Sequence, residues 1–293
     1  MTEALIDTEF LERLANLRFI VRGRWKGRLS GVHASRRAGV SLEFADYREY
    51  CPGDDLRYVD WNIYGRLDRV LVKSFVHEVD LPVTLLVDCS ASMSLGQPSK
   101  LRYAGRLCAA LSYLGLNGLE RVGVYPFAER LLPGIPPRHG MRQMGHVLRL
   151  LQGLSAERPT AMDEALAQYV AHSHESGLVF VIGDLLTDRG YEEGISRLRV
   201  RGDRVVVVQL LAREELDPAL EGSVRITEAE SAQHLELDIG RRTLAQYRQR
   251  LDAELSRLES FLAGLQIPYF LVPTDAPLEE LLYRRFRAQG VLQ

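Results

Sequence analysis

The sequence predicts an α/β fold in which a mostly parallel, doubly wound sheet is covered by helices on both faces. Short, almost wholly apolar runs recur along the chain from residue 81 onward. Amphipathic stretches with helical spacing alternate with these runs. Strands that are apolar on both faces and alternate with helices are typical of a parallel sheet buried between two helix layers.

The predicted strands are apolar runs rich in β-branched residues. They cover residues 81–87, 122–127, 178–182, 204–211 and 267–272. The predicted helices carry apolar residues at intervals of three and four. They cover residues 101–116, 141–151, 162–172, 191–198 and 242–265. For the last of these, we favour a helix packed on the sheet over a coiled coil.

Residues 1–79 differ in composition and are expected to form an N-terminal extension packed on a core domain of residues 80–293. Thr8 is expected to cap a short amphipathic helix that bears Phe10, Leu14 and Leu17. Gly, Ser and Arg dominate residues 22–40 and indicate loops or short strands. Residues 68–79 alternate only roughly, which predicts an edge strand or a hairpin.

A basic arm lies in this extension, with no acid between Arg13 and Ser41. Its basic residues are Arg13, Arg18, Arg22, Arg24, Lys26, Arg28, Arg36 and Arg37. The arm is either solvated and covers the edge of the core, or a docking surface for an acidic protein face. Nucleic acid is the third alternative.

The segment Pro52-Gly53-Asp54-Asp55 also allows two interpretations. We favour a tight turn whose acids pair with nearby arginines over a second acidic metal site. Trp61 and Tyr64 are expected to anchor the extension on the core, because aromatic rings bury a large area at low entropic cost.

Composition excludes several classes of function. Lys and Arg total 37 against 39 Asp and Glu, so the net charge of -2 gives no overall attraction to nucleic acid or to an anionic membrane. The acidic N-terminus does not resemble a secretory signal, and no apolar run approaches the roughly 20 residues of a membrane span. We therefore expect a cytoplasmic protein. Cys51, Cys89 and Cys108 lack metal-site spacing and are expected to be reduced thiols.

Candidate ligands follow two of the predicted strands. Asp88, Ser90 and Ser92 come directly after the first strand, and the period of two in an extended chain places them on one side. Asp184 follows the strand at 178–182, and Thr160 precedes the helix at 162–172. Ligands of doubly wound sheets bind at the carboxyl ends of such central strands. Hydroxyl oxygens with two carboxylates favour Mg²⁺ or Mn²⁺, with one position open to an outside oxygen.

Two other interpretations of these residues stay open. Ser90 and Ser92 could cap the next helix while Asp88 forms an ion pair. Asp88 could instead be the nucleophile of a metal-dependent phosphatase or hydrolase of the haloacid dehalogenase type, although Ser90 takes the place of the acid–base Asp. Gly-x-Ser-x-Gly around the serines is absent, and so is a P-loop string, which argues against a serine hydrolase and an ATPase.

The string Asp88-Cys89-Ser90-Ala91-Ser92, followed by Thr160 and Asp184, resembles the metal-ion-dependent adhesion site of von Willebrand factor A domains. The resemblance implies a von Willebrand factor A-like, Rossmann-type fold. It also implies that the two serines and the threonine bind Mg²⁺ directly or through water, while the carboxylates often act through water. Gly183 departs from the Ser or Thr commonly found before the last Asp.

The upstream segment is similar to the signature of the bacterial family called domain of unknown function 58. The residues that carry this similarity are Gly31, His33, Ser35, Arg36, Arg37, Gly39, Glu43, Phe44, Arg48, Tyr50, Pro52, Gly53, Asp54, Asp55, Arg57, Asp60 and Trp61. Members are commonly encoded beside MoxR-type AAA+ ATPases. The resemblance implies a non-enzymatic, metal-dependent adaptor that binds such an ATPase, or its client, in the remodelling or maturation of protein complexes.

Overall fold

The structure is a computed structural model that describes residues 10, 13–14, 16–20, 42–52, 56–77, 82–187, 190–219, 222–227 and 234–293. The chain forms two compact units. One consists of Met1–Arg22 and Leu81–Gln293, and the other of Gly23–Asp80. We call the first the sheet unit and the second the hairpin unit.

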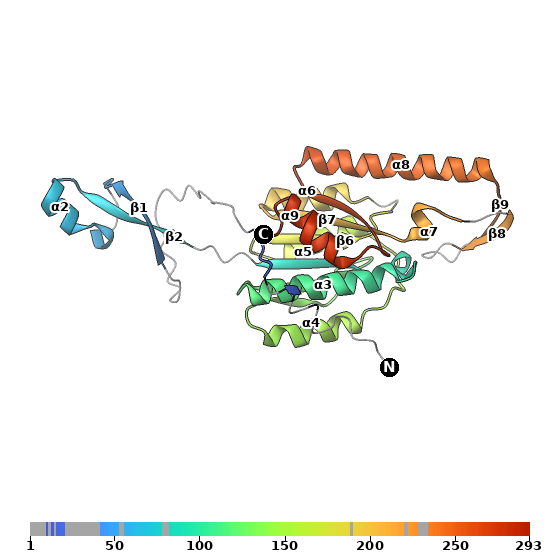
Figure 1. Ribbon diagram of the computed structural model, residues 1–293, viewed down its shortest axis with the longest axis horizontal. Coiled ribbons are helices and arrows are strands. Elements are labelled where there is room, and N and C mark those ends of the chain that lie inside the picture. The colour runs from blue at the N-terminus through green and yellow to red at the C-terminus, as the bar shows by residue number, and fades with distance from the viewer. Residues whose placement is uncertain are drawn as a thin grey trace. The chain divides into compact units, whose positions relative to one another are not determined.

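The sheet unit is built on a six-stranded sheet with the order β10-β7-β6-β3-β4-β5 (Figure 1). Its strands are β3 (Val83–Asp88), β4 (Val122–Phe127), β5 (Ile135–Arg138), β6 (Leu178–Gly183), β7 (Arg204–Leu211) and β10 (Tyr269–Pro273). Neighbours pair in parallel, except that β5 runs antiparallel to β4. Taken in chain order, this is the 3-2-1-4-5-6 arrangement of doubly wound sheets, whose winding reverses between β3 and β6. The predicted α/β, mostly parallel fold is therefore confirmed.

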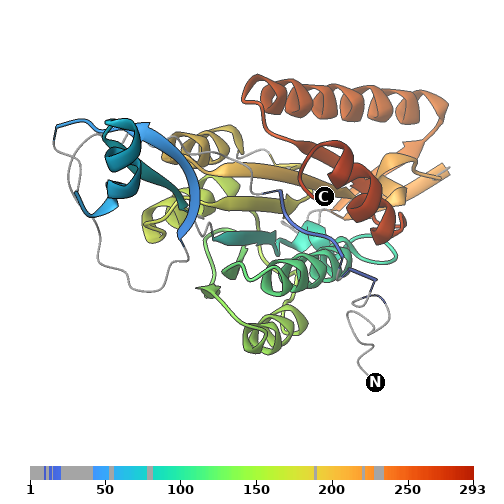
Figure 2. The ribbon, with the colours of Figure 1, turned by 60° about the vertical axis from the view of Figure 1, so that its left-hand side comes forward.

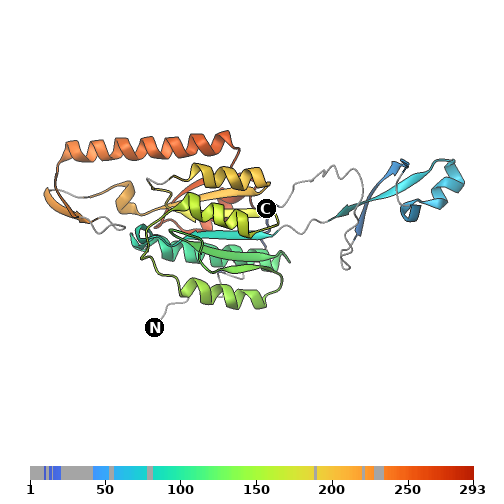
Figure 3. The ribbon, with the colours of Figure 1, turned by 180° about the vertical axis from the view of Figure 1, so that it is seen from behind.

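Helices cover both faces of the sheet (Figure 2). One face carries α3 (Lys100–Asn117), α4 (Arg142–Gln152), the π-helical turn η3 (Glu280–Arg285) and α9 (Phe286–Ala288). The other face carries α5 (Met162–His172), α6 (Glu192–Arg201) and α8 (Arg241–Gly264). Figure 3, seen from behind, brings the yellow helices α5 and α6 to the front.

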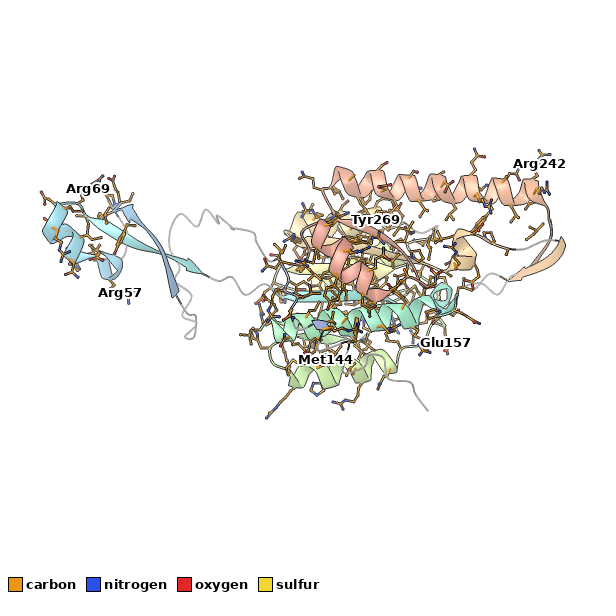
Figure 4. The ribbon with its side chains drawn as sticks, in the orientation of Figure 1. Arg57, Arg69, Met144, Glu157, Arg242 and Tyr269 are labelled. Carbon is orange, nitrogen blue, oxygen red and sulfur yellow. The ribbon has the colours of Figure 1, made fainter. Side chains whose placement is uncertain are left out.

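Successive residues of each central strand enter different apolar layers. On β6, Phe180 packs with the α3 layer, whereas Val179 and Val181 pack with the α5 layer. The alternation follows from the period of two in a strand. Two residues labelled in Figure 4 mark these layers: Met144 of α4 belongs to the α3 layer, and Tyr269 of β10 packs against the α5 layer.

The described residues of the N-terminal segment belong to the core of the sheet unit. Phe10, Leu14, Leu17 and Phe19 are buried there, and the ring of Phe19 lies 5.8 Å from that of Phe180. Phe19 also forms an antiparallel bridge with Leu292. Hydrogen bonds link the backbone of Arg18 to that of Gln293 in both directions, at 3.3 and 2.9 Å. The start of the chain is thus fastened to residues 291–293.

A short helix and a hairpin connect β7 to α8. They are α7 (Arg213–Leu216), β8 (Gly222–Thr227) and β9 (His234–Ile239). The strands β8 and β9 pair antiparallel and form a separate two-stranded sheet. Arg242, labelled in Figure 4, marks the beginning of α8.

The hairpin unit consists of two antiparallel strands and a capped helix. Its elements are β1 (Leu42–Glu49), η1 (Leu56–Tyr58), α2 (Trp61–Leu67) and β2 (Leu71–His77). The carboxylate of Asp60 accepts hydrogen bonds from the backbone of Asn62 at 3.0 Å and from the hydroxyl of Tyr47 at 2.9 Å. Arg57 and Arg69 mark this unit in Figure 4.

The predictions for the extension have different outcomes. The strand expected within residues 68–79 is β2. The basic residues from Arg22 to Arg37 and the turn at residues 53–55 lie outside the described residues. The division at residue 79, the packing of the extension on the core and the anchoring role of Trp61 and Tyr64 stay predictions. Across the part of the chain that the structure describes, no helix has both the length and the apolar character that crossing a membrane requires.

We expect Phe19→Ala to lower the free energy of unfolding by about 3 to 5 kcal/mol, because it removes a buried ring from the interior. Urea denaturation followed by circular dichroism measures this loss. Val200→Ala is the control, since Val200 is 88% exposed and its truncation should stay within about 0.5 kcal/mol. Equal losses in the two variants would contradict the placement of Phe19 in the core.

Candidate metal site

Asp88 ends the strand β3 at the point where the winding of the sheet reverses. The pairing of β3 with β4 continues one residue further, since the backbone N–H of Cys89 donates to Phe127 at 2.7 Å. Oδ1 of Asp88 accepts the backbone N–H of Ser90 at 2.8 Å. This bond turns the chain sharply after the strand and fixes a buried carboxylate at its end.

The two serines after Asp88 converge on each other. Ser90 Oγ and Ser92 Oγ lie 3.0 Å apart. Ser90 is fully buried, whereas Ser92 is partly exposed. Solvent therefore reaches the pair through Ser92.

The structure does not support the capping interpretation of these serines. Ser90 precedes the 3-10 turn η2 (Ala91–Ser94) without a side-chain capping bond. The helix α3 is capped instead by Ser99, whose Oγ accepts the backbone N–H of Arg102 at 3.3 Å.

The loop that carries Thr160 runs beside the serines. The backbone N–H of Ala91 donates to the carbonyl of Arg158 at 2.7 Å, and Ser90 forms a parallel bridge with Arg158. Three residues further, the backbone N–H of Ala161 donates to the carbonyl of Ala128 at 3.0 Å. These bonds hold Thr160 between two anchored positions, with its hydroxyl oxygen buried. Figure 4 shows Glu157, which lies in this loop, at the same end of the sheet as α7.

Gly183 brings the end of β6 against Asp88. A Cβ atom at position 183 would lie 2.7 Å from Cβ of Asp88 and 2.9 Å from its Oδ2. These distances are shorter than packed carbon and oxygen atoms tolerate. The departure from Ser or Thr at this position therefore has a physical reason, since a side chain would displace the carboxylate of Asp88.

Asp184 is adjacent to this contact, but both of its carboxylate oxygens have other partners. Oδ1 accepts the backbone N–H of Leu186 at 3.3 Å, and the residue between them, Leu185, has a left-handed backbone with a φ of 52°. Such a φ is uncommon outside glycine and is often found at functional sites. Oδ2 accepts a hydrogen bond from Lys100 Nζ at 2.9 Å.

Lys100 and Glu215 were not among the predicted site residues. Lys100 begins α3 and is completely buried, and its Nζ lies 2.6 Å from Oε1 of Glu215 on α7. A sequence signal for Lys100 did exist, because a cation in the first turn of a helix opposes the helix dipole and needs a reason. Its partners are 84 and 115 positions away, which no local pattern reveals.

The pKa of Lys100 is raised above its ordinary value. Burial alone would lower it, but the carboxylates of Asp184 and Glu215 more than reverse that effect. Lys100 is therefore protonated at neutral pH and forms a buried ion pair with both acids.

The oxygen atoms at this edge fit a small hard cation. Octahedral Mg²⁺ holds its ligands at about 2.0 to 2.1 Å, which places neighbouring ligand atoms about 2.8 to 3.0 Å apart. The hydroxyl oxygens of Ser90 and Ser92 already have the separation of such a pair. Asp88 Oδ2 and Thr160 Oγ1 are buried oxygens from the same set of loops. Both carboxylate oxygens of Asp184 already accept hydrogen bonds, so Asp184 would act on the metal through water.

Softer metal chemistry has less support. Within the described residues, no three His, Cys, Asp or Glu side chains gather in a way that could hold a metal ion. Burial, and then the charge of Asp88, raise the pKa of Cys89 to about 12, and its thiol points to the carbonyl of Val87 at 3.6 Å. Cys89 therefore stays a protonated thiol rather than a thiolate ligand.

We expect Gly183→Ala to lower the free energy of unfolding by about 1 to 3 kcal/mol and to weaken Mg²⁺ binding, because the new methyl group overpacks the carboxylate of Asp88. Thermal denaturation with and without Mg²⁺ measures both effects. Gly145→Ala in α4 is the control, since a Cβ there meets nothing within 4 Å and should stabilise the helix by about 0.5 to 1 kcal/mol. A Gly183→Ala variant with unchanged stability and metal response would contradict the close approach.

Several solved structures resemble the chain. One is a conserved hypothetical protein, BatB, from Bacteroides thetaiotaomicron, at 16% identity over 72% of this chain and 98% of that chain, with a TM-score of 0.45. Another is proximal thread matrix protein 1 from the mussel byssus with a zinc-occupied MIDAS motif, at 15% identity over 45% of this chain and 38% of that chain, with a TM-score of 0.36.

Relatives are also found among curated proteins. Uncharacterized proteins of Mycobacterium tuberculosis (strain ATCC 25618 / H37Rv) and Mycobacterium bovis are 23% identical over 275 residues, which is 92% of this chain and 86% of each relative. The family described as "Protein of unknown function DUF58" matches residues 46–257, from the hairpin unit into α8. The chain therefore belongs to the DUF58 family.

Proposed function

We propose that the chain binds Mg²⁺, or Mn²⁺, through Ser90, Ser92 and Thr160, with Asp88 and Asp184 in support. The observation that carries this proposal is the pair of hydroxyl oxygens at 3.0 Å, placed beside a buried carboxylate where the winding of the sheet reverses. The site residues lie at the ends of strands and in anchored loops, so little ordering is needed before a metal binds.

In this proposal, the metal grips a carboxylate presented by a partner protein. A cation held mainly by neutral hydroxyls keeps more of its positive charge than one bound directly by several acids. It therefore attracts an anionic ligand at its open position. Ser92, the partly exposed member of the set, leaves that position accessible from solvent.

Apolar side chains near the site would supply contact area. Leu95 follows η2 and is 44% exposed, and Leu186 follows Asp184 and is 37% exposed. Both belong to loops that carry candidate ligands. A metal contact surrounded by apolar side chains is the arrangement expected of a protein-binding site with a few dominant contacts.

The resemblance described above supports a MoxR-type AAA+ ATPase, or a client delivered to it, as the partner class. We propose a non-enzymatic adaptor that acts beside such an ATPase in the cytoplasm, where ATP is available. The competing function is a phosphatase or hydrolase that uses Asp88. Ser90 disfavours it, because its hydroxyl cannot replace the carboxylic acid that would move the proton.

We expect Mg²⁺ at ten times its dissociation constant to stabilise the protein by about 1.4 kcal/mol, or roughly 3 to 6 °C in melting temperature. Asp88→Ala and Ser90→Ala should remove this gain. Ser94→Ala is the matched control, because Ser94 Oγ donates to the carbonyl of Ala91 and lies outside the predicted ligand set. Absence of any shift in wild type, together with no heat of binding at millimolar Mg²⁺ or Mn²⁺, would refute the metal site.

We expect a MoxR-type ATPase from the same organism to co-purify with the chain in Mg²⁺ and to be lost in EDTA. Asp88→Ala and Ser90→Ala should abolish the interaction, and Leu95→Asp should weaken it while the thermal response to Mg²⁺ is kept. Ser94→Ala should behave as wild type. Turnover of generic phosphate esters that disappears in Asp88→Ala would support the phosphatase instead, and binding that survives both ligand substitutions would exclude the metal as the contact.

A further inference from the structure

The Lys100 cluster, formed by Lys100, Asp184 and Glu215, connects the candidate metal site to α7. Nζ of Lys100 lies 2.9 Å from Asp184 Oδ2 and 2.6 Å from Glu215 Oε1. Oε2 of Glu215 accepts the backbone N–H of Ala212 at 2.7 Å, and the hydroxyl of Tyr247 on α8 donates to the carbonyl of Glu215 at 2.7 Å. Each member of the cluster is thus held by backbone bonds or burial.

Stability alone explains this cluster poorly. Burying an ammonium group is costly, and apolar residues of similar volume often stabilise a fold at least as well as a buried ion pair. The place of Lys100 in the first turn of α3 adds an unfavourable interaction with the helix dipole. A lysine at this position therefore needs a reason beyond packing.

The charges of the described residues suggest that reason. Asp88, Asp184 and Glu215 carry three negative charges, and Lys100 returns one positive charge. Three negative charges and one positive charge leave a net charge of -2, which is equal in size and opposite in sign to that of one divalent cation. Without Lys100, the three carboxylates would carry more negative charge than one divalent cation can neutralise. The carboxylate of Asp184 would also be available to bind the metal directly.

We infer that Lys100 is a built-in counter-cation of the metal site, which takes one of its carboxylates so that a bound Mg²⁺ keeps the charge needed to attract an outside carboxylate. This inference rests on the proposed function. Lys100 is a positioning residue in this scheme, since it acts on the metal through Asp184. It lowers the affinity for the metal and raises the affinity of the bound metal for an outside anion.

The size of the effect follows from electrostatics. A unit positive charge about 6 Å from a divalent cation weakens its binding roughly tenfold even at the dielectric constant of water. A less polar environment increases this factor. Removing the charge should therefore be measurable as a change in metal affinity.

We expect Lys100→Met in the full chain to bind Mg²⁺ and Mn²⁺ about tenfold more tightly than wild type in calorimetric titrations. Acetate serves as the probe for the outside carboxylate. Its displacement of water from the Mn²⁺-loaded protein, followed by water proton relaxation, should require a severalfold higher acetate concentration in Lys100→Met. Arg102→Met, which removes an exposed cation from the same helix, should change neither affinity by more than about twofold.

A second variant covers the case in which Lys100→Met fails to fold because Asp184 and Glu215 have lost the cation that both of them contact. Lys100→Met with Glu215→Gln restores the net charge of the wild-type cluster, so any gain in metal affinity comes from freeing Asp184. Tighter metal binding in either folded variant supports the inference. Affinity equal to or below that of wild type in every folded variant overturns it, as does an equal gain in Arg102→Met.

These outcomes separate the inference from the proposed function. If wild type binds metal and the variants bind it no more tightly, only the role of Lys100 is wrong. If wild type binds no metal but Lys100→Met does, the role of Lys100 is supported, while the proposed metal occupancy of wild type fails. If no form binds metal, both proposals are overturned.

Discussion

The parallel pairing of β3 with β6 is the constraint on which the candidate site depends. The winding of the sheet reverses between these strands, so the loops that follow them separate and leave their carboxyl ends open. Gly183 then allows the two strand ends to approach until the carboxylate of Asp88 occupies the space of a missing side chain. The ligand geometry therefore depends on backbone contacts that a larger residue at this one position would disturb.

Much of the sheet unit could be predicted from sequence, because its elements are specified locally. The predicted strands and helices agree with the observed ones within three residues at either end. Apolar runs and helical periodicity indicate which residues are buried. A parallel sheet with a helix layer on each face is the arrangement that buries them. The strand-end positions of Asp88 and Asp184 followed from the same reasoning, because a residue after a buried strand lies at the edge of the sheet.

The remaining features depend on contacts that distance along the chain conceals. The predicted helix begins at residue 101 and gives Lys100 no role in the site, since both of its acidic partners come from later elements. The edge strand β5 (IPPR) contains two prolines and no apolar run, and pairs only with β4. The hairpin of β8 and β9 alternates polar and apolar residues, but its strands form a sheet apart from the main one, so the doubly wound pattern gave no place for it.

The bridge between Phe19 and Leu292 has a consequence for how the protein is made. These residues are 273 positions apart, and at about 5 to 20 residues per second roughly 14 to 55 seconds separate their synthesis on a ribosome. During that interval Phe10, Leu14 and Leu17 lack the part of their apolar cluster that includes Leu292. The sheet unit therefore cannot complete its core until the segment that contains Leu292 has been synthesised, because Phe19 finds its native strand partner only there.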